Sequence, residues 1–328
     1  MHQGDTVIKT YLFTETETRE DIPPEDWQSA AQGDCALLWV DVRSMDDGDI
    51  ALLTEAFGLH SLAIESMKDR YRRPHLYQFH DHFYVNMTMV TNTRGGHGVK
   101  PMELHLFVGA RYVITVVSEA TCEAVDSALE EYRNTPGLCV RGPMYAVYLL
   151  TEDLVETYYP IVDKLDDDAD KLESTMLDHA DKKSLARNFE LKRRGFELRK
   201  LLGPQRDILN DLSRRDFPFI EGENQVYFQD VYNRMIRLFD ILDTVREILS
   251  GNLDIYLSTV SNRLNEVMKV LTVWSIILMA LSFITGFYGM NFAHLPWLRS
   301  PNAFRNALIA MALIIVAMLW LFRRKKFV

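Results

Sequence analysis

Residues 271–289 read LTVWSIILMALSFITGFYG and contain no charged residue. A second apolar stretch, residues 303–322, reads AFRNALIAMALIIVAMLWLF and is polar only near its start. Each has about the 20 residues that a helix needs to cross the hydrocarbon core of a bilayer. A buried helix of a soluble protein is the alternative, but two such stretches in succession, the second followed by a basic cluster, favour two transmembrane helices.

The basic residues that flank these stretches predict their orientation. Four follow the second stretch directly: Arg323, Arg324, Lys325 and Lys326. Arg263 and Lys269 precede the first stretch, whereas the connecting residues 290–302 contain only Arg299. Because basic residues collect on the cytoplasmic side, we expect both termini in the cytoplasm and the loop outside. The chain is thus predicted to be a multi-pass protein of the inner (plasma) membrane.

The rest of the chain has the composition of a soluble protein. The formal net charge is −10, which argues against nucleic acid as a partner. Cys35, Cys122 and Cys139 lie far apart, which argues against a zinc finger and a disulfide framework. Residues 1–20 are polar, so we expect no signal peptide, and insertion depends on the C-terminal stretches.

Residues 1–143 alternate segments typical of strands and of helices, which predicts a compact cytoplasmic α/β domain. The expected strands are residues 7–13, 36–42, 83–90, 104–108 and 112–117, and the expected helices are residues 46–57, 61–70 and 121–133. The Gly109-Ala110 step between the last two strands predicts a tight hairpin.

Residues 144–222 are predicted to form a charged helical hairpin. Residues 152–178 hold ten acids and two lysines, whereas residues 182–206 hold nine bases and two acids. Opposite charges on consecutive helices suit antiparallel packing with complementary faces. Two solvated helix faces, or an acidic surface that collects cations, are the other interpretations.

Residues 223–270 predict a cytoplasmic stalk helix that continues into the first apolar stretch. No proline occurs between Pro218 and Pro296. Apolar residues recur at a mean spacing of about 3.67 residues, at Leu238, Leu242, Val245, Leu249, Leu253, Tyr256, Val260, Leu264, Val267 and Leu271. A helix of some 60 residues would be about 90 Å long. Its apolar stripe needs partners, which other copies of the chain or the helical hairpin could supply.

One face of the first apolar stretch is small, polar or flexible. Its residues recur at steps of three or four: Met268, Leu271, Ser275, Met279, Ser282 and Gly286. Close helix packing within the membrane and the lining of a pore both fit this pattern. Because two spans cannot enclose an aqueous path, a pore would require several copies.

The residues that end this stretch, Tyr288-Gly289-Met290-Asn291-Phe292, resemble the Y-G-M-N-F signature of the CorA family of divalent cation channels, the 2-TM-GxN superfamily. The similarity extends upstream through residues 256–272 and includes both spans and the basic cluster. It implies an outlying member with an N-terminal α/β domain, a long stalk helix and two C-terminal transmembrane helices. It also implies a funnel-shaped homopentamer whose pore is lined by the first span.

The resemblance further implies roles for single residues. Gly289, Met290 and Asn291 would form the selectivity filter, with a ring of Asn291 amides holding hydrated Mg²⁺ by its water shell. Met268, Leu271 and Met279 match the apolar constrictions of the family. Asn265 and Asp254 match polar positions below them, with Asp254 at the pore entrance. Arg323 to Lys326 match a basic ring. The membrane potential would drive transport.

The chain also departs from the family pattern. Residues 292–299 contain no acid, although the family usually has glutamates there. Asp230 matches the stalk acid of the family's regulatory metal site, but Ser66 stands where the second acid is expected, which leaves Glu65 or Asp69 as replacements. Ala280 replaces a proline common in the first span, which predicts a straighter helix.

The resemblance therefore favours transport of Mg²⁺, with Co²⁺ and Ni²⁺ as further substrates, and no cofactor beyond the transported ion. A Zn²⁺ transporter of the ZntB-like branch is the alternative, since His294 in the loop is a ligand suited to a softer ion. A membrane-anchored enzyme or scaffold is the alternative of another class, but no nucleotide-binding or hydrolase motif supports an enzyme. His80-Asp81-His82 predicts two histidines on one strand face, without a third metal ligand.

Overall fold

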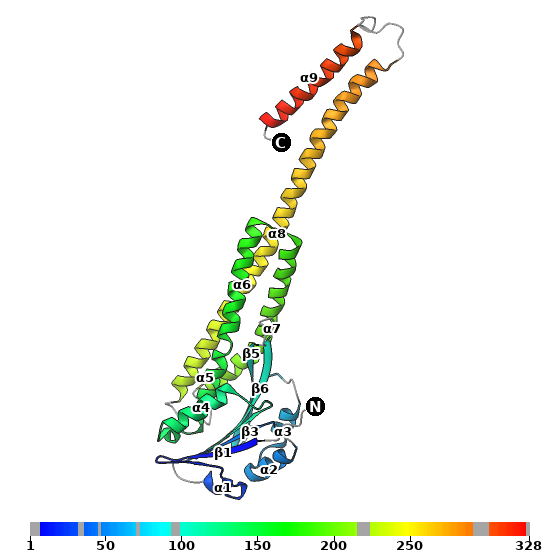
Figure 1. Cartoon of the computed structure of the whole chain (residues 1–328). Helices are drawn as coiled ribbons and strands as arrows, with labels where there is room; N and C mark the ends of the chain where they lie inside the picture. The colour runs from blue at the N-terminus through cyan, green and yellow to red at the C-terminus, as the bar shows by residue number, and fades with distance from the viewer. Residues whose placement is uncertain are drawn as a thin grey trace. The chain divides into compact units, whose positions relative to one another are not determined.

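The computed structural model describes residues 7–31, 36–44, 47–69, 73–92, 99–214, 224–290 and 302–325. The chain forms two compact units (Figure 1). The first comprises Met1–Ser174 and Ala186–Ser250, and the second comprises Thr175–Leu185 and Gly251–Val328. The long helix α8 contributes to both units.

The described helices lie between and after the strands of one sheet. The α-helices are α1 (Trp27–Ala30), α2 (Asp47–Phe57), α3 (Ser61–Lys68), α4 (Glu123–Asn134), α5 (Pro143–Glu156), α6 (Tyr159–Asp178), α7 (Lys182–Leu212), α8 (Gln225–Tyr288) and α9 (Ala303–Arg324). Two short 3-10 helices, η1 (Pro24–Asp26) and η2 (Leu138–Arg141), precede α1 and α5.

A seven-stranded sheet with the order β2-β1-β3-β7-β6-β5-β4 forms the base of the first unit. The strands are β1 (Val7–Phe13), β2 (Thr18–Glu20), β3 (Leu37–Arg43), β4 (His75–Gln78), β5 (His82–Asn92), β6 (Val99–Gly109) and β7 (Tyr112–Val117). Among the described strands, β3 and β7 pair in parallel and the other neighbours pair antiparallel. Strand β3 is a nearly continuous apolar run because both of its faces are covered.

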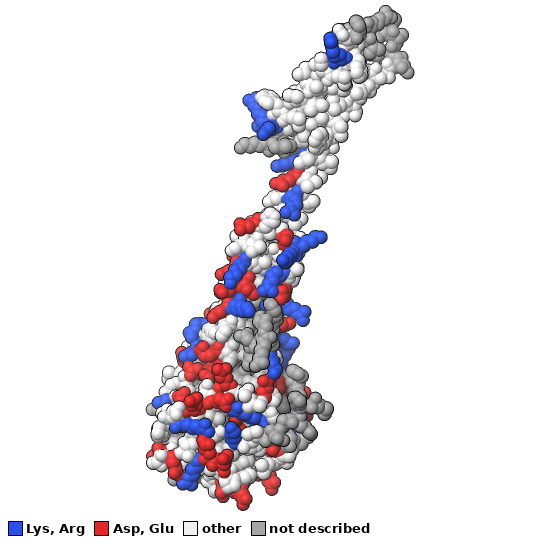
Figure 2. All heavy atoms as spheres, viewed as in Figure 1, with Lys and Arg blue, Asp and Glu red and all other residues white. Residues whose placement is uncertain are grey.

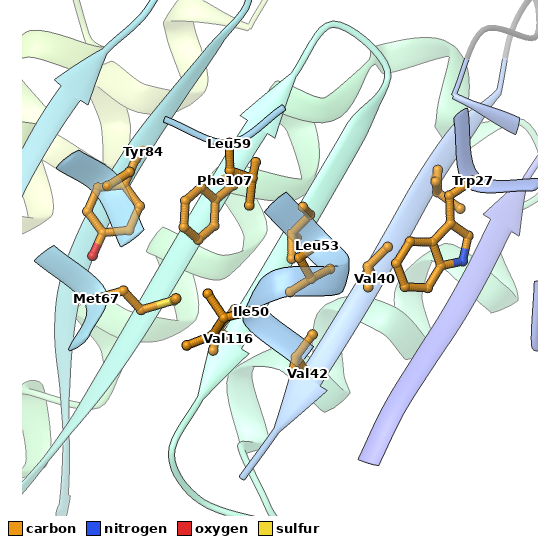
Figure 3. Close-up of a cluster of buried hydrophobic side chains, with 13 residues drawn as sticks. Trp27, Val40, Val42, Ile50, Leu53, Leu59, Met67, Tyr84, Phe107 and Val116 are labelled. Atoms are coloured by element: carbon orange, nitrogen blue, oxygen red, sulfur yellow. The ribbon is translucent and has the colours of Figure 1, made fainter. Parts of the chain in front are cut away.

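Helices cover both faces of this sheet. On one face, side chains of α1, α2 and α3 such as Trp27 and Leu53 pack against Val40 and Phe107 of the strands (Figure 3). On the other face, the Tyr132 ring of α4 lies edge-on to Trp39 of β3, with ring centroids 5.6 Å apart. Helix α5 contacts β5, β6 and β7 on that side. The result is the α/β domain that the alternating segments predicted.

Helices α6 and α7 continue the first unit and pack beside the first part of α8. The α7 residue Asn188 donates from Nδ2 to the Leu249 carbonyl of α8 at 2.9 Å. Farther along α7, the Gln205 amide joins the helices to the sheet: its Oε1 accepts from the Thr88 amide at 3.0 Å, and its Nε2 donates to the Tyr158 hydroxyl at 2.8 Å. These bonds fix α7 against β5 and the start of α6.

Helix α8 is one uninterrupted helix of 64 residues. At 1.5 Å per residue it is about 96 Å long. The spacing of its apolar residues and the absence of proline predicted this helix correctly. Leu238, Leu242, Val245 and Leu249 of the predicted apolar stripe are buried in the first unit, so the stripe is partly covered within the same chain.

The predicted strands and helices of the α/β domain are confirmed, with ends displaced by up to a few residues. The tight hairpin at Gly109 is also confirmed, because β6 ends at Gly109 and pairs antiparallel with β7, which begins at Tyr112. The short elements β2, β4 and α1 were missed. Every residue of β2 is exposed, so no apolar alternation marked it.

Candidate functional site

Helix α9 and the C-terminal part of α8 have surfaces suited to lipid. The most apolar 18-residue segments of α9 and α8 have mean hydropathies of 2.1 and 2.2, and few of the residues in these segments are buried. Figure 2 shows Lys, Arg, Asp and Glu spread over the first unit, whereas the surface of these two helices is almost free of them on the face shown. Both helices are long enough to cross a bilayer.

Within the second unit, one face of α8 is covered. Val273 and Ile277 are only 4% and 3% exposed, and their neighbours along the same line, Ala280 and Ile284, are half-buried. Helix α9 carries a matching half-buried stripe, formed by Ala303, Ala307, Met311, the adjacent Ile314 and Ile315, Met318 and Phe322. Each helix therefore uses one face for packing within the chain.

The six residues predicted to line a pore all lie on an uncovered face of α8. Met268, Leu271, Ser275, Met279, Ser282 and Gly286 are all exposed, and Met279 is 70% exposed. At about 100° per residue, the middle of this face lies about half a turn from Val273 and Ile277. The small and flexible residues thus lie on a part of the α8 surface that the chain leaves open.

Two polar residues predicted to lie below the constriction, Asp254 and Asn265, are also exposed on α8. A surface hollow of about 590 Å³ begins at this level. Its lining combines amide, hydroxyl and charged groups: Asn262, Asn265, Glu266, Met268, Lys269 and Thr272. Asn265 and Met268 therefore lie side by side on the lining of this open hollow.

The signature at the end of α8 lies only partly within the described residues. The Gly289 amide donates to the Thr285 carbonyl at 2.9 Å, and the Met290 amide donates to the Phe287 carbonyl at 3.4 Å, so both continue the last helical turn. Asn291, His294 and the rest of residues 291–301 lie outside the described residues.

The basic cluster after α9 is described up to Lys325, and Lys326 lies outside the described residues. Arg323 and Arg324 form the last turn of α9, where cations interact favourably with the helix dipole. The Arg324 guanidinium lies 5.3 Å from the Trp320 ring centroid.

The expected regulatory pair does not meet within one protomer as far as the structure describes it. The Asp230 carboxylate bonds to Arg234 Nε at 2.9 Å, and Glu65 is exposed on α3. Ser66 is buried, with its Oγ 2.5 Å from His75 Nε2. Ser66 therefore lies inside the core next to His75, and its side chain is not presented at the surface of the domain. No group of three His, Cys, Asp or Glu that could hold a metal occurs among the described residues.

Arg234 of α8 forms ion pairs with three carboxylates and was not predicted from the sequence. Besides Asp230, its guanidinium bonds to Glu156 at 2.9 Å and to Glu152 at 3.2 Å on α5. The spacing of four residues between Asp230 and Arg234 was the available signal. The two acids of α5 could not be assigned to it before α5 and α8 were known to be neighbours.

The prediction for His80 and His82 was wrong. His80 is exposed in the turn before β5, whereas His82 is buried at the start of that strand. His82 Nδ1 lies 2.8 Å from Asp81 Oδ1, and its Nε2 lies 3.5 Å from the His60 amide. The two rings therefore have different environments and form no surface pair.

The ionisation of Asp153 on α5 is expected to affect the stability of the folded state. Burial, together with Glu152, Glu131 and Glu156, raises the pKa of Asp153 to about 6. A pKa raised in the folded state means that ionisation destabilises this state as the pH rises from about 4 to about 6. We expect Asp153→Asn to raise the melting temperature of the detergent-solubilised chain by roughly 2–4 °C at pH 7.5, which corresponds to about 1 kcal/mol after solvent screening.

The same substitution should have little effect at pH 4, where the carboxyl is already protonated. Asp240→Asn, at an exposed position of α8, is the matched control and should change neither value. An equal stabilisation at both pH values would show that side-chain charge is not the cause.

Most of this chain is similar to known proteins. The profile of the family described as CorA-like Mg2+ transporter protein matches residues 34–324. The cobalt/magnesium transport protein CorA of Thermotoga maritima is 35% identical over 290 residues, which cover 88% of this chain and 82% of that protein. The solved CorA magnesium transporter from Methanocaldococcus jannaschii, 23% identical, covers 98% of this chain with a TM-score of 0.80 and shows the same fold.

A more limited match involves zinc. The zinc transport protein ZntB of Pectobacterium carotovorum is 23% identical over 132 residues, or 39% of each chain.

The long helix, the second apolar helix and the α/β domain define a two-span divalent cation transporter. The chain belongs to the CorA-like family, and it is therefore a transporter rather than an enzyme.

Proposed function

We propose that this chain forms an oligomeric channel for divalent metal cations, with Mg²⁺ as its main substrate. The uncovered face of α8 is the observation that carries this proposal. Ser275 and Met279 lie on it, about half a turn from the packed Val273 and Ile277. When several copies place these faces around one axis, they enclose a path that one chain cannot form. The family likeness favours five copies.

In this channel residues 271–289 and 303–322 cross the inner membrane, and residues 290–302 form the outer loop. Residues 1–143, 144–222 and 223–270 lie in the cytoplasm, as does the tail, residues 323–328. Asn291, with Gly289 and Met290, forms the outer ring. Its amide oxygens hold a hydrated ion without removing its tightly bound water.

The lining below this ring alternates polar and apolar groups. Met268, Leu271 and Met279 gate the path by excluding water when they close, whereas Ser275 and Ser282 offer hydroxyl groups. Asp254 and Asn265 attract the ion toward the cytoplasmic end. The membrane potential is worth about 4.6 kcal/mol for a doubly charged ion at 100 mV, which suffices for driven uptake without ATP.

Co²⁺ and Ni²⁺ are further substrates in this proposal; a relative that is 35% identical is named a cobalt/magnesium transport protein. Transport of Zn²⁺ is the second candidate function. It is favoured by the match to ZntB and by His294, an imidazole in a loop without carboxylates. Asp230 and Glu65, from neighbouring copies, remain the proposed regulatory metal ligands.

Metal uptake into liposomes that contain the purified full chain tests the proposal. We expect influx of Mg²⁺, Co²⁺ and Ni²⁺ to increase when the lumen is made negative, and to exceed influx of Zn²⁺. In Asn291→Ala the differences among the metals should shrink, because the ring that holds the hydrated ion is lost.

Asn302→Ala, an amide substitution at the cap of α9, is the matched control and should keep the metal preference. Influx no greater than in protein-free liposomes would reject the channel, and influx of Zn²⁺ alone would establish the second candidate.

A further inference from the structure

Two phenylalanine side chains are exposed on α7 in the first unit. Phe189 and Phe196 are 54% and 69% exposed. Because they are seven residues apart, they lie two turns apart on the same face of the helix. Lys192 and Lys200 lie on the same side and make no ion pair with the residues that the structure describes. These four residues form a flank that is both apolar and basic, the α7 flank.

Helix α6 carries an acidic flank in the same unit. Asp163, Asp166, Asp170 and Glu173 follow one another at steps of three or four, and none makes an ion pair within the described part of the chain. Burial, with repulsion from Asp170, Asp167 and Asp163, raises the pKa of Asp166. The negative charge of these four residues, the α6 flank, is therefore not compensated within one protomer.

The two flanks lie on opposite sides of the helix pair. Arg187 of α7 bonds to Asp168 of α6 at 2.8 Å, which marks the sides on which the two helices meet. At about 100° per residue, Phe189 and Phe196 lie about half a turn from Arg187, and the α6 flank lies about half a turn from Asp168. The expectation that the acids of α6 face the bases of α7 within one hairpin is thus wrong for these residues.

We infer that the α7 flank of one copy docks on the α6 flank of a second copy. This inference rests on the proposed oligomeric channel, which requires copies side by side. A contact between two different surfaces repeats from one copy to the next and can close into a ring. The α7 flank cannot pair with itself, because its lysines would repel each other. The acidic α6 flank supplies the opposite charge, and the phenylalanine rings supply the apolar area that excludes water from an interface.

Charge reversal tests this contact in the detergent-solubilised full chain. We expect Lys192→Glu with Lys200→Glu to lower the assembled fraction after dilution by roughly threefold or more. Asp166→Lys with Asp170→Lys should have the same effect, and the four substitutions together should restore assembly. Light scattering during gel filtration measures the assembled fraction, and circular dichroism verifies that each variant is folded.

A second variant tests the apolar part. Phe189→Ser with Phe196→Ser should also reduce assembly, whereas Val140→Ser, at an exposed apolar position outside α6 and α7, should not. Arg19→Glu, at an exposed position on β2, is the control for charge.

Crosslinking tests the same contact directly. One tagged copy carries Lys192→Cys and a differently tagged copy carries Asp166→Cys, and a bismaleimide reagent joins neighbouring thiols. We expect more crosslinked pairs than with Lys192→Cys and Arg19→Cys, and more than in chains with only the native cysteines.

Equal assembly of all variants, together with no excess crosslinking, would overturn this contact. The channel proposal would stand if such chains still assemble and take up cations. A wild-type chain that remains monomeric would contradict both.

Discussion

Ser275→Phe is expected to lower divalent cation influx into liposomes by about tenfold or more. Ser275 lies on the uncovered face of α8 between Leu271 and Met279. In a pore formed by several copies, each would add an aromatic ring at the same level and remove a hydroxyl group that can bind water. A narrow path with an apolar lining loses its water, and ions then face a high barrier.

Thr285→Phe is the matched control for this prediction. Thr285 is also exposed on α8 and also bears a hydroxyl group, but it lies about 80° from Ser275 around the helix. An aromatic ring there should face lipid or a neighbouring helix and leave most of the influx intact. A block by Thr285→Phe with normal influx in Ser275→Phe would place the cation path on another face of α8.

The long helix and its exposed face could be predicted because they follow from local patterns. Apolar residues at helical spacing, without proline, define α8 wherever its partners lie. The position of Ser275, Met279 and Ser282 on one face needs only the pitch of a helix. Whether this face packs or stays open could not be decided from the sequence. That answer depends on α9, whose stripe matches the covered line of Val273 and Ile277.

The electrostatic features were less predictable, because they depend on contacts between distant segments. The Ser66 hydroxyl and His75 meet only after α3 and β4 are placed together. The acids of α6 and the bases of α7 suggested complementary faces. The four acids of the α6 flank, however, lie about half a turn from Asp168, which bonds to α7. Net charge along a helix therefore did not predict which neighbour its side chains face.

Removal of Arg43 is expected to destabilise the α/β domain by about 3 kcal/mol, because it leaves a buried carboxylate without its cation. Asp41 of β3 is 1% exposed, and its Oδ2 accepts from Arg43 Nε at 2.8 Å. Its Oδ1 accepts from Thr115 Oγ1 at 2.9 Å. Burial raises the pKa of Asp41, and the Arg43 guanidinium opposes this shift. Arg43→Met keeps the aliphatic part of the side chain and removes only the charge and its donors.

The melting temperature of detergent-solubilised Arg43→Met should fall by roughly 6–12 °C at pH 7.5. Without Arg43, the pKa of Asp41 should rise further, so the loss should shrink as the pH falls toward 5 and the carboxyl takes up a proton. Asp41→Asn in the Arg43→Met background should recover much of the stability, since a neutral amide keeps the bond to Thr115. Arg19→Met, at an exposed ion pair with Glu17, should change stability by less than about 0.5 kcal/mol. If the double variant is as unstable as Arg43→Met, the loss comes from the other contacts of Arg43, such as its bonds to Asp126 and to the Ala120 carbonyl, and the unpaired charge of Asp41 is not its cause.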